Sequence, residues 1–508
     1  MRKKQSVFRY GQDHLTPFLA VKIASGEIKG IVTEPVKKRI LRCQKTVLAI
    51  VEKGVSVYGI NTGFGPLCKT AISKEQTKKL QENILRSHSV GVGALIDKRL
   101  AKLMLVLKVH SLSFGYSGVS LETLNRIIWH IEADAIPTVP CQGSVGASGD
   151  LAPLAHLFLP LIGLGQVHYQ GQIISTRALF KQKGLDKIKL GPKEGLALIN
   201  GTQFMAAHGV DVVVRLHNAL ESADIIGALS LEAMLGSSRP FSDKLLALRP
   251  FAGARHVAFR LSQLLNNSPL VKSHAGCHRV QDPYSLRCMP QVHGASRDAW
   301  AYINQQIVTE LNSVTDNPVI FSEKETISGG NFHGQPIALP LDHASLAASE
   351  LGSISERRTY LLLEGKEGLP LLLMKDTGIN SGFMIPQYTA AALVSENKSL
   401  CFPASADSIP TSVGQEDHVS MGSISARKAC AIINNLEYIL AVELLCAAQA
   451  LDYRRPLTTT PVLEACHAQV RSKITHAEHD RIFAQDLEVA RQMLAAGELV
   501  IAANGIKI

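Results

Sequence analysis

The chain has 508 residues, of which 46% are hydrophobic and 19% charged, enough for two or three compact units with sizeable cores. This composition excludes a disordered protein, and Gly and Pro break the apolar runs short of the roughly 20 residues that a membrane span needs. The net charge of +10 lies in scattered clusters such as Lys37–Arg39 and Lys181–Lys193, without interleaved aromatic residues. We therefore expect no nucleic-acid and no membrane partner, and at most weak attraction of an anionic substrate.

The first residues are basic, but no apolar stretch follows them, so no secretion signal is predicted. Nine cysteines lie between Cys43 and Cys466, and none of them forms a C-x-x-C pair. In a long chain, this pattern predicts reduced thiols and a cytoplasmic protein.

Helical signals begin near the N-terminus. Thr16 followed by Pro17 predicts an N-cap and a first turn, and Gly26 is expected at the end of that helix. Pro35 predicts the start of a second helix, with an apolar face and an end before Gly54.

The remaining chain is also mostly helical in pattern. Ser73-x-x-Gln76 is typical of a capping box and predicts a helix that runs to His88. Further helical patterns cover about residues 97–112, 120–133, 203–235, 295–313, 341–364 and 424–452. Strand-like pieces are few and short, near residues 55–58, 166–174 and 319–321. A mainly α protein is predicted.

Six segments between the helices combine glycine with hydrogen-bonding or ionisable side chains. Any one of them alone would be interpreted as a turn, but six together favour a functional site, because chemistry usually occurs on loops held by a rigid scaffold. They are YGINTGFG (58–65), GSVGASGDLAP (143–153), NGTQ (200–203), QDPYSLRC (281–288), SGGNFHG (328–334) and GQEDHVSMG (414–422).

The segment from Gly143 to Asp150 admits three interpretations. A phosphate cradle is disfavoured, because neither G-K-[ST] nor G-x-G-x-x-G after a strand is present. A hydrolase nucleophile at Ser148 is disfavoured, because a nucleophile elbow needs G-x-S-x-G and Gly149 follows the serine directly. In the third, a tight turn brings the Gly149 nitrogen onto the Ala147 carbonyl, the backbone closes into a five-membered ring, and loss of water turns Ser148 into a methylidene.

The third interpretation yields a strongly electrophilic alkene, and a known family matches it. GSVGASGDLAPLAH resembles the signature of the aromatic amino acid ammonia-lyase and aminomutase family, whose cofactor is 4-methylidene-imidazol-5-one. The resemblance extends from about residue 12 to 498. It implies a long helical bundle of the fumarase and aspartase type (199–508) and a smaller α-rich N-terminal domain (1–198) that carries active-site loops. It also implies a homotetramer with active sites shared between three chains, no external cofactor and no essential metal.

The resemblance assigns roles to individual residues in the other segments. Tyr58 matches the catalytic tyrosine of the family's mobile lid, and Asn200 matches the asparagine beside the electrophile. Tyr284 matches a further catalytic residue, and Gln281 and Arg287 match substrate-binding residues; a neighbouring subunit supplies all three in the family. Phe332 matches a phenylalanine of the substrate pocket.

The chemistry explains why these residue types are needed. Ammonia is a poor leaving group and the β-hydrogen of an amino acid is barely acidic, so the reaction needs both an electrophile and a base. The phenol of Tyr58 would need nearby positive charge to act as that base, and Glu416 is the alternative base. The planar fork of Arg287 suits the substrate carboxylate. Whether the amine or the aromatic ring attacks the electrophile stays open.

Two positions bear on the substrate. The pair Ser87-His88 resembles the pair found at this position in members that act on histidine. Phenylalanine-type members have Phe-Leu there, and tyrosine-type members have His-Leu. Glu416 matches a glutamate of the histidine-type members, where it accepts the imidazole N–H. The resemblance thus implies elimination of ammonia from L-histidine to give trans-urocanate. Gly414 departs from many relatives, which carry Asn there. Another aromatic substrate, an aminomutase and a catalytically silent binding protein are the alternatives.

A zinc site is a further alternative, since five potential ligands lie close together in sequence. It is disfavoured because no C-x-x-C knuckle is present, and satisfied histidines and free thiols are expected instead. The five residues are His274, Cys277, His278, Cys288 and His293.

Overall fold

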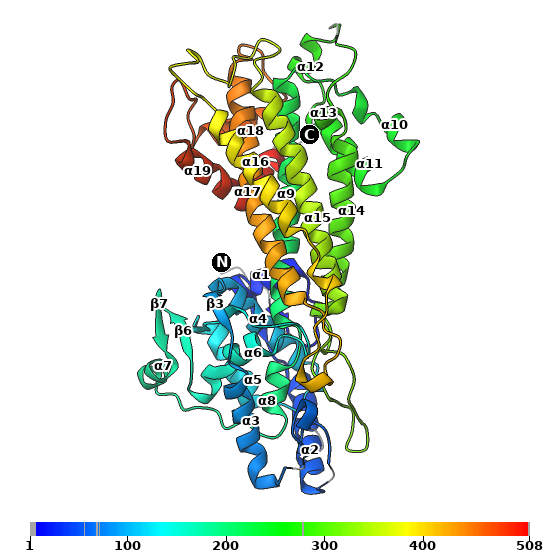
Figure 1. Ribbon diagram of the computed structural model, residues 1–508, viewed down its shortest axis with the longest axis vertical. Coiled ribbons are helices and arrows are strands. Elements are labelled where there is room, and N and C mark those ends of the chain that lie inside the picture. The colour runs from blue at the N-terminus through cyan, green and yellow to red at the C-terminus, as the bar shows by residue number, and fades with distance from the viewer. Residues whose placement is uncertain (1–6, 55, 68–69, 71, 277–278, 506–508) are drawn as a thin grey trace. The chain divides into compact units, whose positions relative to one another are not determined.

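The computed structural model describes residues 7–54, 56–67, 70, 72–276 and 279–505, and these are predominantly helical (Figure 1). The prediction of a mainly α fold is confirmed. By internal contacts the chain divides into unit 1 (residues 1–211, 303–342 and 403–427) and unit 2 (212–302, 343–402 and 428–508). The sequence-based boundary between an N-terminal domain (1–198) and a helical-bundle domain (199–508) is a different kind of division, and it stays a prediction.

Unit 1 contains the first eight helices, and sequence signals explain several of their ends. Thr16 Oγ1 accepts a hydrogen bond from the Leu19 nitrogen at 3.3 Å, Pro17 occupies the first turn, and Gly26 ends the helix with a φ of 83°. Both predicted ends of this first helix are confirmed. The eight helices are α1 (Pro17–Ser25), α2 (Glu34–Glu52), α3 (Lys74–His88), α4 (Lys98–Leu112), α5 (Leu121–Glu132), α6 (Leu151–Phe158), α7 (Thr176–Lys183) and α8 (Glu194–Ile199).

Two local predictions in this region are wrong. Ser73 precedes α3 as expected, but its side chain caps no backbone N–H; the Ser73 carbonyl accepts the N–H groups of Gln76 and Thr77 instead. The capping box therefore does not form. Residues 56–58 are not a strand but lead into a turn whose start is held by a hydrogen bond from the Val57 nitrogen to Asn61 Oδ1, at 2.8 Å.

The described strands are short and form small separate sheets rather than one large sheet. The strand-like stretch near 166–174 is a hairpin, because Gln170 and Gly171 both have positive φ, as a two-residue hairpin turn requires. The strands are β1 (Val7–Arg9) with β2 (Lys29–Ile31), β3 (Val92–Leu95) with β5 (Pro140–Gln142), β4 (Ile136–Pro137) with β6 (Gln166–Tyr169) and β7 (Gln172–Ser175), and β8 (Val319–Ile320) with β9 (Thr326–Ile327).

Four of the five borders between the units fall within long helices, and the fifth lies between residues 402 and 403. The four helices are α9 (Gln203–Ala233), α14 (Met289–Leu311), α15 (Gln335–Leu362) and α17 (Gly422–Asp452). α14 and α15 begin about six residues earlier than predicted. In α14 the early glycine is a packing residue: Gly294 lies against Gly253, where an added Cβ at Gly253 would come 2.1 Å from the Gly294 carbonyl oxygen. The helices wholly within unit 2 are α10 (Asp243–Ala247), α11 (Ala252–Leu264), α12 (Pro269–Ser273), α13 (Tyr284–Arg287), α16 (Met384–Leu400), α18 (Pro461–Arg471), α19 (Phe483–Ala495) and α20 (Glu498–Asn504).

Within unit 2, a buried ion pair joins the long helices, which Figure 1 shows running alongside α16. Arg358 of α15 and Glu443 of α17 are both fully buried and form a bidentate pair at 2.5 and 2.8 Å. Ser230 of α9 donates to the same carboxylate, and His293 of α14 contacts the guanidinium. Four helices are thus tied together at one charged pair.

One described helix, α17, is long and apolar enough to cross a membrane by length and composition alone. Within the molecule, however, 72% of its apolar window is buried, as in the core helix of a bundle.

Glu443→Gln is expected to lower the free energy of unfolding by about 3–5 kcal/mol, because it leaves the buried Arg358 without its counter-charge. The control is Asp243→Asn, which breaks the exposed pair with Arg255 and should cost about 0–1 kcal/mol. Guanidinium unfolding of both variants measures the difference, and equal losses would contradict the role of the buried pair.

Candidate active site

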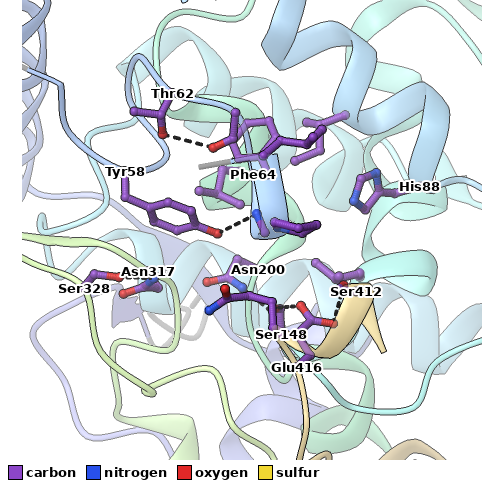
Figure 2. A pocket seen from close by; sticks show the side chains of 18 of the residues that line it. Tyr58, Thr62, Phe64, His88, Ser148, Asn200, Asn317, Ser328, Ser412 and Glu416 are labelled. Atoms are coloured by element: carbon purple, nitrogen blue, oxygen red, sulfur yellow. Dashed lines mark hydrogen bonds between the residues drawn. The ribbon is translucent and has the colours of Figure 1, made fainter. Parts of the chain in front are cut away.

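A cavity of about 840 Å³ in unit 1 is lined by residues from five of the six glycine-containing segments (Figure 2). Six of the predicted site residues line it: Tyr58, His88, Ser148, Asn200, Phe332 and Glu416. A second hollow of about 250 Å³ shares His88 and Glu416 with the first and is lined by Ala147 and Gly149. Residues more than 350 positions apart in sequence therefore meet around the 147–149 turn, as the resemblance implies.

The turn at Gly149 is pressed against a second backbone segment. Gly149 has a φ of 77°, and a Cβ there would lie 2.1 Å from the Gly201 carbonyl oxygen. The same oxygen accepts a hydrogen bond from the Asp150 nitrogen at 2.7 Å. Any side chain at 149 would push these segments apart, so only glycine fits here.

Asn200 holds the carbonyl next to this turn. Its Nδ2 donates to the Ser148 carbonyl oxygen at 2.8 Å, and its Oδ1 is buried and accepts no hydrogen bond from the described residues. A buried amide donor fixed on one carbonyl oxygen stabilises negative charge that develops on that oxygen.

The other side of the turn is held by the start of α17. The Met421 nitrogen donates to the Val145 carbonyl at 2.9 Å, and Ser423 Oγ donates to the Ser144 carbonyl at 2.5 Å. Ser420 Oγ donates to the Gly146 carbonyl at 3.2 Å. Residues 144–146 are thus fixed by three successive hydrogen bonds, and residues 149–150 lie against Gly201, so that Ala147 and Ser148 are held from both sides.

Glu416 points at the serine of the triplet. Ser148 Oγ donates to Glu416 Oε1 at 2.7 Å, and the Ser412 hydroxyl donates to Oε2 at 2.9 Å (Figure 2). The Thr411 hydroxyl also donates to Oε2, at 2.9 Å. The carboxylate is therefore oriented from behind and presents one oxygen to the cavity. Gly414 next to it has a φ of 81° with open space around it, a conformation that Gly and Asn tolerate best, which explains why this departure leaves the loop intact.

His88 and Tyr58 approach the cavity from other segments (Figure 2). Burial lowers the pKa of His88, so its imidazole is neutral near pH 7 and carries one donor and one acceptor. Its Nδ1 lies 2.9 Å from Ser87 Oγ. Tyr58 Oη accepts a hydrogen bond from the Gly65 nitrogen at 3.3 Å, within the same loop.

Several lining residues were not singled out from the sequence. Asn317 is buried; its Nδ2 donates to Ser328 Oγ at 3.0 Å and its Oδ1 accepts from the Gly329 nitrogen at 2.7 Å, which fixes the loop that carries Phe332. Asn83 lies one helical turn before Ser87 on the same face of α3. That face was the available signal, because residues four apart on a helix are neighbours.

The fully buried Asp150 lies directly behind the turn. Asp150 Oδ2 accepts a hydrogen bond from the Met205 nitrogen at 3.0 Å. Burial raises the pKa of Asp150 to about 7. Its contact with the start of α9 joins the triplet to the same segment as Asn200 and Gly201.

Three predicted residues belong to unit 2 and line neither of the two cavities around the 147–149 turn. Gln281 is exposed and Tyr284 is 72% exposed. Arg287 Nε donates to the Asp282 carbonyl at 3.0 Å, and its guanidinium lies 4.6 Å from the centre of the Tyr284 ring. Their assignment to a substrate pocket stays a prediction.

No group of three or more potential metal ligands is present in the described part of the chain. His274 contacts the Leu270 and Gly236 carbonyls, and His293 pairs with Asp224 at 2.8 Å. Cys277 and His278 lie outside the described residues.

Comparisons with known proteins show the family to which the chain belongs. The family model described as aromatic amino acid lyase matches residues 15–472. The chain is 48% identical over 470 residues to the histidine ammonia-lyase of Deinococcus radiodurans, covering 91% of this chain and 89% of that protein. It is 46% identical to that of Natranaerobius thermophilus, covering 91% and 92%.

Solved structures of proteins with related activities have the same fold as this chain. The crystal structure of histidine ammonia-lyase from Trypanosoma cruzi matches with a TM-score of 0.91 and 40% identity, covering 98% of this chain and 95% of that one. Tyrosine aminomutase from Streptomyces globisporus matches with a TM-score of 0.93 and 34% identity, covering 98% of both chains.

Gly149→Ala is expected to lower the free energy of unfolding by about 1–3 kcal/mol more than Gly26→Ala, because the new Cβ overpacks the contact with Gly201. Gly26 is a matched control, since its φ of 83° imposes the same backbone strain with nothing within 4 Å. Guanidinium unfolding measures both, and similar losses would show that the contact with Gly201 is not tight.

Proposed function

Because the chain belongs to the aromatic amino acid lyase family, we propose that it eliminates ammonia from L-histidine to give trans-urocanate. The observation that carries this proposal is the contact between Glu416 and Ser148, which puts an oriented carboxylate at the predicted electrophile. An imidazole N–H pairs with such an acceptor, whereas the ring of phenylalanine would leave it unpaired. The histidine ammonia-lyases that the chain resembles at 46–48% identity support the same substrate.

We propose that Ala147, Ser148 and Gly149 close into 4-methylidene-imidazol-5-one. The residues present fit such a ring: Gly149 lies where a Cβ has no room, and Ala147 is small and buried. When formed, this group supplies an electron-poor alkene that no ordinary side chain provides. Asn200 would hold it through the Ser148 carbonyl oxygen, and no external cofactor is required.

The surrounding residues have separable tasks in this proposal. In the open peptide, Glu416 Oε1 accepts a hydrogen bond from the Ser148 hydroxyl. Ring formation removes that hydroxyl and leaves this oxygen to accept a hydrogen bond from the substrate imidazole. The neutral His88 offers a second hydrogen bond to the same ring. Tyr58 is the candidate for removal of the β-proton, since the Gly65 N–H stabilises negative charge on its oxygen, and Glu416 is the alternative.

We further propose that the protein is a cytoplasmic homotetramer in which neighbouring chains complete each site. Arg287 would bind the substrate carboxylate, with Gln281 and Tyr284 beside it. The exposure of Gln281 and Tyr284 in one chain supports this arrangement, because both are available to a second chain. Phe332 would pack against the substrate from the cavity wall.

Intact-mass measurement tests the ring directly. The denatured protein should be lighter than its sequence mass by two water molecules, because ring closure and loss of the Ser148 hydroxyl each release one. Ser148→Ala should be folded, lack the full loss of mass and have activity lower by orders of magnitude. A mass equal to the sequence mass in active wild-type protein would overturn the proposal.

Glu416→Gln should reduce kcat/KM for histidine by about 10²–10³-fold, because it removes the charged acceptor from the site. Asp417→Asn, one residue on and exposed, is the matched control and should change kcat/KM little. Ultraviolet absorbance of the conjugated product follows turnover with histidine, tyrosine and phenylalanine. Turnover of tyrosine or phenylalanine in preference to histidine would contradict the assigned substrate.

A further inference from the structure

Lys108 is a buried cation behind the site, in the middle of α4. It is 1% exposed, although lysine is almost never fully buried unless it is paired. Its ammonium donates to the Asn200 carbonyl oxygen at 2.7 Å and lies 3.4 Å from Gln203 Oε1. Burial lowers its pKa to about 7. Burial of an ammonium group costs free energy, so a specific role for Lys108 is expected.

A direct ion pair does not supply a reason for this burial. The nearby buried carboxylate of Asp316 already has two direct partners, Lys193 Nζ and Ser117 Oγ, both at 2.7 Å. The direct partners of Lys108, by contrast, are uncharged oxygens of Asn200 and Gln203. Lys108 is therefore placed to fix a backbone carbonyl and forms no direct pair with an acid among the described contacts.

The carbonyl that it fixes belongs to the segment that holds the triplet. Asn200 donates through its side chain to the Ser148 carbonyl at 2.8 Å. The next residue, Gly201, presents the oxygen that lies against Gly149 and accepts the Asp150 nitrogen. The Lys108 ammonium thus anchors Asn200. The Asn200 side chain and the Gly201 peptide that follows it hold Ser148 and Gly149, respectively.

We propose that Lys108 is a positioning residue, which fixes the Asn200 carbonyl so that Asn200 and Gly201 hold the 147–149 turn in the geometry needed for ring closure and turnover. This inference rests on the proposed function. Lys108 lines neither cavity, so it acts through Asn200 and does not contact the substrate.

Lys108→Met keeps the length of the side chain and removes its charge and donors. We expect kcat to fall by about 10²-fold, as for a site displaced by about 1 Å, with KM nearly unchanged. Intact mass should show a larger fraction of unclosed protein. The matched control is Lys102→Met, on the same helix, which loses only its pair with the half-exposed Asp134 and should match wild type in kcat and mass. Lys108→Arg, which retains charge and donors, should restore most of kcat.

A cycle with Asn200→Ala separates positioning from a general role in stability. If Lys108 acts through the Asn200–Gly201 segment, the double variant loses clearly less kcat than the product of the two single losses. Multiplied losses, or a Lys108→Met kcat equal to that of Lys102→Met, would overturn the inference. Should Lys108→Met be recovered unfolded, Lys108→Gln replaces it in the same cycle, with the same two outcomes. The wild-type mass is read first: without the loss of two waters the proposed function itself fails, and this inference fails with it.

Discussion

The close contact between Gly149 and Gly201 is the constraint on which the site depends. It leaves no room for a Cβ at 149, it places the Asn200 amide on the Ser148 carbonyl, and it brings the Asp150 nitrogen to the Gly201 oxygen. Hydrogen bonds from the start of α17 fix residues 144–146 on the other side. A short peptide held at both ends has few conformations left, and this pre-organisation is what an intramolecular backbone reaction requires.

The same constraint defines what the cavity recognises. With the triplet fixed, the Glu416 loop needs only to present one carboxylate oxygen, and the Thr411 and Ser412 hydroxyls orient it from the side away from Ser148. Burial keeps His88 neutral, so the two residues offer a charged acceptor and an uncharged partner to an imidazole ring. In the proposed function, specificity for histidine would follow from these polar groups, because an unpaired acceptor in a partly buried cavity is costly.

The helices and the fold class were largely predictable from the sequence, because helix caps and apolar periodicity act over few residues. The first helix, between Thr16 and Gly26, and the mainly α fold followed from caps and apolar periodicity. The capping box at Ser73 failed because the backbone carbonyl, not the hydroxyl, meets the helix N-terminus. The motif segments indicated the site residues, but no sequence pattern reports that Lys108 points at the Asn200 carbonyl, since that contact spans 92 positions and depends on tertiary packing. The roles proposed for Gln281, Tyr284 and Arg287 rest on the resemblance, because these residues belong to unit 2 and line neither of the two cavities around the 147–149 turn.

The central claim is that residues 147–149 close into a ring bearing an alkene. A crystal structure of freshly purified, active enzyme at a resolution that separates single atoms tests it most directly. If the ring has formed, continuous density joins the Gly149 nitrogen to the Ala147 carbonyl carbon, with a planar methylidene in place of the Ser148 hydroxyl. An open, ordinary peptide with an intact serine hydroxyl on Glu416 in such a crystal would contradict it.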